Sequence, residues 1–149
     1  MSADDTIHPE AATAPGYLAN HAARVFNRNV DARLREHGLS LSLIGPVLLL
    51  AWKGPMRQRD LVAHSAVRQP AMVALLDKLE GMGLLTRTAH PDDRRAALIT
   101  LTAAGERMAA LGGEVLRAEN ARGGTGLMAA EQATLVALLQ RFITALEGT

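Results

Sequence analysis

The side chains best suited to bind another molecule lie in the middle of the chain, between residues 57 and 101. Apolar residues recur there at the i, i+3, i+4, i+7 spacing of a helix with one buried face, at Met72, Leu75, Leu76, Leu79 and Gly83. The other face is polar or small and comprises Arg68, Gln69, Ala71, Val73, Ala74 and Lys78. Glutamine can hydrogen-bond an adenine edge, arginine a guanine or a phosphate, and small apolar side chains contact thymine methyl groups. The composition of this face alone favours an ordinary solvated helix surface. A helix that reads DNA bases becomes the favoured interpretation once the strands that follow it are considered.

A second, shorter helix is predicted directly before this one, over Arg57–Ala63. The three residues His64–Ala66 are enough only for a turn, so the two helices form a helix-turn-helix, whose second helix enters the major groove. Arg57, Gln58 and Arg59 open the shorter helix, where cations and backbone N–H groups suit phosphate. These three residues are expected to position the protein on DNA without reading its sequence.

Two strand-like runs follow, at residues 83–87 and 96–101, around the polar segment 90–95. This arrangement predicts a β-hairpin with a charged tip, the wing of a winged helix. At the tip, one of Arg94 and Arg95 can enter a narrow minor groove while the other pairs with Asp92 or Asp93 to hold the turn. The alternative is a solvated charge cluster that contributes little energy.

The overall charge is close to neutral, so contact with nucleic acid depends on local clustering of cations. Lysine and arginine number 16 against 15 acidic residues, a formal charge of +1, which excludes a polycationic tail. The clustered cations are Arg57, Arg59, Arg68, Lys78, Arg87, Arg94 and Arg95. With 149 residues, of which 48% are hydrophobic, the chain is expected to form one domain with a substantial core.

Cysteine usage and hydropathy indicate the compartment. The chain has no cysteine, which excludes disulfides and thiol switches and fits a reducing environment. No cationic segment followed by an apolar run opens the chain, and no apolar run approaches the ~20 residues that span a bilayer. We expect a cytoplasmic protein that does not bind a membrane.

Catalytic and metal sites are poorly supported by the sequence. The five histidines are scattered without a paired-ligand spacing, and neither an HExxH nor a GxSxG motif occurs. The glycines of residues 123–126 lie between predicted helices and do not follow a strand, as a phosphate-binding loop would. We therefore predict no catalytic residue, no metal ligand and no cofactor, and expect that the chain is not an enzyme.

Helices flank the central region on both sides. Residues 1–15 show no periodicity and are expected to form a flexible tail, whereas 16–37 and 102–147 are predicted to be largely helical. The last helix carries an apolar stripe wider than one neighbouring helix covers, which indicates a partner. Its predicted interface residues are Leu135, Leu138, Phe142 and Ile143.

Taken in order, several short motifs resemble the MarR family of bacterial transcriptional regulators, over residues 17 to 147. The matching motifs are Leu39-Ser40, Pro46-Val47-Leu48, Gln58-Arg59-Asp60-Leu61, Gln69-Pro70-Ala71-Met72, Leu76-Asp77-Lys78-Leu79-Glu80, Gly83-Leu84, Asp93-Arg94-Arg95 and Leu101-Thr102-Ala103-Ala104-Gly105. The resemblance implies a mainly α fold with a small β wing: a winged helix-turn-helix over about 40–101, with dimerisation helices over about 16–37 and 102–147. The resemblance further implies that 16–149 form a single domain, that Asp93 and Arg95 shape the wing, and that Arg94 reaches the DNA.

The resemblance also implies the partners. A homodimer would place two recognition helices about 34–36 Å apart on a pseudo-palindromic operator of double-stranded DNA. Family members commonly repress transcription and release DNA when a small, often aromatic and anionic, effector binds between the dimer helices and the DNA-binding lobe. Candidates for such a pocket are Tyr17, His21, Arg24 and Trp52. The alternative is that Trp52 belongs to the core and Arg24 faces solvent.

This chain departs from the family pattern on the recognition helix. The family often has a hydroxyl residue and an arginine where Val73 and Ala74 stand here, which shifts weight from hydrogen-bonded base reading to apolar contact and DNA shape. A second hypothesis follows from this departure: a winged-helix module that binds a ligand or another protein and has little specific affinity for DNA.

Overall fold

The computed structural model describes residues 8–65, 67–89, 92 and 97–148. The residues Asp93, Arg94 and Arg95, for which the sequence predicts wing contacts, lie outside the described residues. The chain divides into two compact units, Met1–Val115 and Leu116–Thr149. No described helix is long and apolar enough to cross a membrane.

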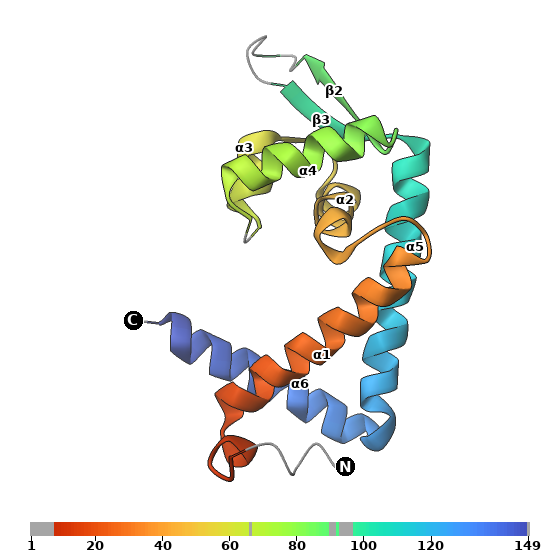
Figure 1. Cartoon of the computed structure of the whole chain (residues 1–149). Helices are drawn as coiled ribbons and strands as arrows, with labels where there is room; N and C mark the ends of the chain where they lie inside the picture. The colour runs from red at the N-terminus through yellow and green to blue at the C-terminus, as the bar shows by residue number, and fades with distance from the viewer. Residues whose placement is uncertain (1–7, 66, 90–91, 93–96, 149) are drawn as a thin grey trace. The chain divides into compact units, whose positions relative to one another are not determined.

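The elements follow in the order expected for a winged helix (Figure 1). They are η2 (Ala11–Thr13), α1 (Pro15–Arg35), α2 (Leu41–Lys53), β1 (Met56–Arg57), α3 (Gln58–Ala63), α4 (Gln69–Gly81), β2 (Leu85–Ala89), β3 (Ala97–Leu101), α5 (Ala103–Gly123), η3 (Gly124–Gly126) and α6 (Ala129–Glu147). The predicted mainly helical fold with a small β wing is confirmed.

The connection from α1 to α2 is held by capping groups. Gly38 adopts φ 74°, the left-handed conformation that glycine favours after a helix. The Ser40 hydroxyl accepts a hydrogen bond from the Leu43 N–H at 3.3 Å and caps α2. The carboxylate of Asp31 on α1 accepts from the Leu41 N–H at 2.8 Å and from Arg35 Nε at 2.6 Å. The backbone hydrogen bond from Leu41, and then Arg35, lower the pKa of Asp31 below its ordinary value.

The sheet has three antiparallel strands in the order β1-β3-β2. The hairpin of β2 and β3 pairs from Leu85 opposite Leu101 to Ala89 opposite Ala97, with Ile99 fully buried at its centre. The short strand β1 was not predicted, because two residues are too few to show an alternation. As a correction, Arg57 belongs to this strand and forms the N-cap of α3, so it precedes the helix that it was expected to open.

The recognition helix, the wing and α5 meet at a tight junction. The Thr102 hydroxyl donates to the Gly83 carbonyl oxygen at 2.6 Å and accepts from the Gly105 N–H at 3.1 Å, so Thr102 caps α5. A Cβ at Gly105 would overlap the carbonyl oxygen of Leu84, so only glycine fits there. Gly83, predicted on the buried face of the recognition helix, is exposed beyond the end of α4 with φ 74°. That prediction is wrong because the helix ends two residues earlier, at Gly81.

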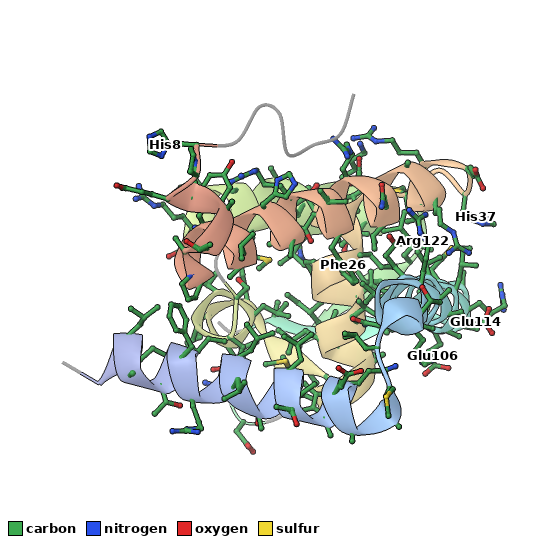
Figure 2. The ribbon with its side chains drawn as sticks, turned by 90° about the horizontal axis from the view of Figure 1, so that it is seen from below. His8, Phe26, His37, Glu106, Glu114 and Arg122 are labelled. Atoms are coloured by element: carbon green, nitrogen blue, oxygen red, sulfur yellow. The ribbon has the colours of Figure 1, made fainter. Side chains whose placement is uncertain are left out.

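The first turns of α5 pack onto α2. Gly112 makes this approach possible, since a Cβ there would lie 2.6 Å from Ile44 Cγ1. The outer side of this helix carries exposed acidic residues, and Glu106 and Glu114 point away from the packed side chains in Figure 2. In this way α5 covers one side of the first unit's core.

The second unit consists of the end of α5, η3 and α6. The predicted break at the glycines of 123–126 is confirmed as η3. The Gln132 side chain amide donates to the Gly124 carbonyl oxygen at 3.0 Å, and Glu131 accepts from the Met128 N–H at 2.8 Å at the start of α6. No described residue of α6 is buried.

Candidate nucleic-acid interface

The predicted recognition helix is α4, and it is anchored by three fully buried residues. Met72, Leu76 and Leu79 are each 0% exposed, and Leu75 is half-buried beside them. Burying side chains of this size stabilises the helix position by roughly 1.5–3 kcal/mol each. Helix α4 contacts α3, β2 and α2, and Figure 1 shows it in front of α3 with the β2–β3 hairpin above it. The packing of these side chains against other elements of the first unit therefore holds α4 in place.

The face of α4 opposite these anchors agrees with the sequence prediction. Exposed side chains are Arg68, Gln69, Ala71, Ala74 and Lys78, whereas Val73 is half-buried. Arg68 is the N-cap residue, and Pro70 in the first turn suits a helix start because its missing N–H has no intrahelical partner there. The helix thus presents one glutamine, two cations and small apolar groups to the surroundings.

The shorter helix α3 and the following turn lie against α4. Leu61 is fully buried, Arg59 is exposed, and Arg57 and Gln58 are half-buried. The Ser65 hydroxyl holds the turn, donating to the Val62 carbonyl oxygen at 3.5 Å and accepting from the Val67 N–H at 3.2 Å. This geometry confirms a helix-turn-helix. The six residues of α3 make it a short support for α4.

Arg87, predicted to belong to the cation cluster, instead forms ion pairs within the chain. Arg87 of β2 forms ion pairs with Asp77 at 2.9 Å and Glu80 at 3.6 Å, both on α4, and its side chain is 26% exposed. Its charge is therefore used within the chain. No local sequence pattern indicates this pairing, because it depends on how the hairpin packs against the helix. At the hairpin tip, Asp92 is exposed.

A hollow of about 620 Å³ opens between α2 and the turn from α3 to α4. It is lined by Leu41, Ser42, Gly45, Pro46, Leu48, Leu49, Trp52, His64, Ser65, Val67 and Met72. Of the four predicted effector-pocket residues, only Trp52 is among them. A hollow that arises where separate elements meet leaves no motif in the sequence, so its other residues were not predicted.

The remaining predicted pocket residues lie on α1. Tyr17 and His21 stack with ring centroids 6.3 Å apart, and Arg24 is exposed, but none of the three lines the hollow. Trp52 is 77% exposed, so the alternative of a core tryptophan is wrong. The ammonium of Lys53 lies 4.7 Å from the centre of the Trp52 ring, a cation–π contact.

The histidines that the structure describes, at positions 8, 21, 37 and 64, do not converge on a site. Figure 2 shows His8 and His37 at opposite ends of α1. Among the residues that the structure describes, no group of three or more His, Cys, Asp or Glu side chains could hold a metal ion.

The predicted dimer residues are exposed on α6. Leu135 is 47% exposed, Leu138 52%, Phe142 36% and Ile143 49%, and Val136, Leu139 and Leu146 are exposed beside them. Exposed apolar residues of this number on one helix are unusual for a surface that stays in water.

Comparison with known proteins identifies the family. The pattern of the MarR family matches residues 47–97. The chain is 31% identical to the HTH-type transcriptional repressor Rv2887 of Mycobacterium tuberculosis over 126 residues, which cover 85% of this chain and 91% of that protein. The transcriptional repressor CouR, whose solved structure is bound to a 23-mer DNA duplex, shares the fold with a TM-score of 0.80 and 24% identity, over 91% of this chain and 96% of CouR.

BpsR of Bordetella bronchiseptica, whose DNA binding is regulated by 6-hydroxynicotinic acid, shares the fold as well. Its TM-score is 0.76 at 22% identity, over 91% of this chain and 96% of BpsR. The match to Rv2887 extends well beyond the helix-turn-helix and covers most of both proteins. This chain belongs to the MarR family of DNA-binding transcriptional regulators.

Proposed function

We propose that this protein is a repressor that binds a pseudo-palindromic operator as a homodimer and releases it when a small effector binds. The observation that carries the proposal is α4, which combines three fully buried anchors with an exposed face of base-reading size and polarity. A rigidly held helix beside a hairpin is the geometry that reads a major groove. CouR, which shares the fold, is a repressor bound to DNA in its structure.

The proposed contacts divide by role. Arg68, Gln69, Ala71, Val73, Ala74 and Lys78 face the major groove, and Arg57, Gln58 and Arg59 lie near phosphates. At the wing, Arg94 enters the minor groove while Arg95 pairs with Asp93 to shape the turn. Val73 is half-buried, so apolar contact is expected mainly from Ala71 and Ala74.

The dimer interface is proposed on α6, at Leu135, Leu138, Phe142 and Ile143. Support comes from their exposure in a single chain, because apolar side chains left in water cost free energy that a second copy can recover. Two-fold symmetry would then impose a two-fold related pair of half-sites on the operator.

The effector site is proposed in the hollow beside α2. Trp52 gives an aromatic surface at its rim, and Met72 of α4 forms part of its wall. A ligand in contact with both α2 and α4 can favour one recognition-helix position, and it shifts DNA binding only by its differential affinity for the two states. A small aromatic acid suits the mixture of leucines, Trp52, His64 and serines, and BpsR provides a precedent for this class of ligand.

The competing function is a ligand-binding or protein-interaction module without specific DNA binding, and the observation that favours it is the non-polar pair Val73 and Ala74 on α4. An enzymatic role has no support from the family or from the described side chains, and we propose that the protein is not an enzyme.

Selection of duplexes from a random DNA pool at fixed salt, followed by sequencing, distinguishes the dimeric DNA-binding repressor from the ligand-binding or protein-interaction module. A retained pseudo-palindrome with half-sites one helical turn apart supports the dimeric regulator. Retention without sequence preference that disappears steeply with salt supports the interaction module instead.

A further inference from the structure

The ion pairs of Arg87 join the wing directly to the recognition helix. Arg87 is the central residue of β2 and lies opposite the fully buried Ile99 of β3. Its guanidinium reaches Asp77 with one terminal nitrogen and Glu80 with the other. Asp77 and Glu80 are three residues apart and therefore neighbours on one face of α4. A single side chain of the hairpin thus holds the C-terminal half of the helix at two points.

This arrangement is not one that stability alone would favour. The Arg87 side chain is 26% exposed, and its Nε is buried with no hydrogen-bond partner. A buried donor without a partner is unfavourable, and partly buried ion pairs can often be replaced by apolar residues with little loss of stability. The guanidinium offers something that an apolar side chain lacks: a planar group that binds two carboxylates in a defined direction.

The charges also matter for a DNA-binding surface. Asp77 directly precedes Lys78, a proposed DNA contact, and Glu80 follows two residues later. Without Arg87, two unpaired carboxylates would stand on the recognition helix and repel phosphates. Pairing with Arg87 therefore keeps the end of the helix compatible with DNA.

We propose that Arg87 is a positioning residue for operator recognition, which fixes the angle between the wing hairpin and α4 so that both engage the duplex in one register. The proposal rests on the proposed DNA-binding function. Arg87 touches no DNA in this arrangement and acts through Asp77, Glu80 and the helix that carries them.

The first test compares Arg87→Met with Arg107→Met, which replaces an exposed arginine of α5. Dissociation constants are measured at fixed salt for a duplex selected by the wild-type protein and for a scrambled duplex, together with urea unfolding midpoints. Arg87→Met should weaken the selected duplex by about tenfold while the scrambled duplex and the midpoint change little. Equal affinities for the selected duplex, or a loss that a fallen midpoint explains, would overturn the positioning role.

A charge exchange tests the pairing itself. Arg87→Glu alone should bind the selected duplex worse than Arg87→Met, because three carboxylates then gather on one side of α4. Adding Asp77→Arg should restore much of that affinity, since the new guanidinium can pair with residue 87 and with Glu80. No recovery in the double variant would contradict an action through the ion pair.

The position of α4 relative to the wing hairpin can be measured with spin labels, because the native chain has no cysteine that would also be labelled. Spin labels at Gly81→Cys and Ala89→Cys, both exposed positions, report the separation of α4 from the end of β2. The distance distribution should broaden in Arg87→Met relative to the otherwise unchanged protein. An equally narrow distribution would refute the inference, whereas a wild-type protein that distinguishes no duplex would instead refute the proposed function on which it rests.

Discussion

Helices α4 and α6 carry comparable apolar stripes, but within the described part of one chain only α4 buries its own. Met72, Leu76 and Leu79 are fully buried, whereas no described residue of α6 is buried and Leu138 is 52% exposed. Exposed apolar surface costs roughly 25 cal/mol per Å², so a single chain leaves on α6 a cost in free energy that it does not leave on α4. The difference suggests a division of labour: the helix proposed to read DNA is fixed by its own chain, and the helix proposed to pair subunits is left available.

The largest effect is expected where α4 joins α5. Gly105→Ala should destabilise the protein by about 3 kcal/mol, because the added methyl group would overlap the Leu84 carbonyl oxygen. The matched control is Gly81→Ala within α4, where a Cβ meets nothing within 4 Å. The control should be neutral or stabilising by up to about 1 kcal/mol. Urea denaturation measures both, and similar losses in the two variants would show that the junction does not hold α4.

Leu138→Glu should abolish the proposed dimer while leaving the fold of the first unit intact. The charge would have to be buried without a partner between two α6 helices. Sedimentation velocity measures the oligomeric state and circular dichroism the helix content. A dimer that persists in this variant would show that the interface is not on α6. The exposed apolar stripe of α6 would then no longer be explained by pairing of two subunits.

Arg94→Ala should weaken operator binding by a smaller amount. If Arg94 contacts a phosphate or the minor groove, its loss lowers the slope of log affinity against log salt by about 0.9. Arg33→Ala, at an exposed position on α1, is the control that should leave the slope unchanged. An unaltered slope for Arg94→Ala would exclude a DNA contact of the wing through Arg94, and only the proposed base contacts of α4 would remain.

The smallest effect concerns Asp31, which ties α1 to α2 in the first unit. The Leu41 N–H and then Arg35 lower the pKa of Asp31 in the folded protein. The carboxylate therefore stabilises the fold fully above its unfolded pKa of about 3.9, and this stabilisation is lost as the pH falls through the folded pKa. Asp31→Asn should flatten the fall in stability below about pH 4. Urea midpoints of both proteins between neutral and acidic pH would test this, and parallel curves would exclude Asp31 from the acid response.

The sequence predicts α1, α4, α5 and α6 because an apolar repeat at helical spacing runs along each of these segments. In the structure Gly38 follows α1 with φ 74°, and the hydroxyls of Ser40 and Thr102 cap α2 and α5. The exposed face of α4 was also predicted, since the helical period alone decides which residues face outward.

Features that depend on two separate segments were not predicted. The strand β1 exists because Met56 pairs with Ile99, 43 positions later, and two residues show no pattern by themselves. The Arg87 ion pairs and the hollow beside Trp52 likewise depend on how elements pack. Arg87 looked like a free cation for DNA because sequence alone does not reveal the distance to Asp77.

The most direct test of base reading by α4 is to repeat the duplex selection with Gln69→Ala and Gln58→Ala. Both variants remove a glutamine, but Gln69 opens α4 and Gln58 is proposed to lie near phosphate. Gln69→Ala should relax the base preference at one position in each half-site, whereas Gln58→Ala should lower affinity and retain the same consensus. An unchanged consensus and affinity for Gln69→Ala would contradict the reading of DNA by this helix face.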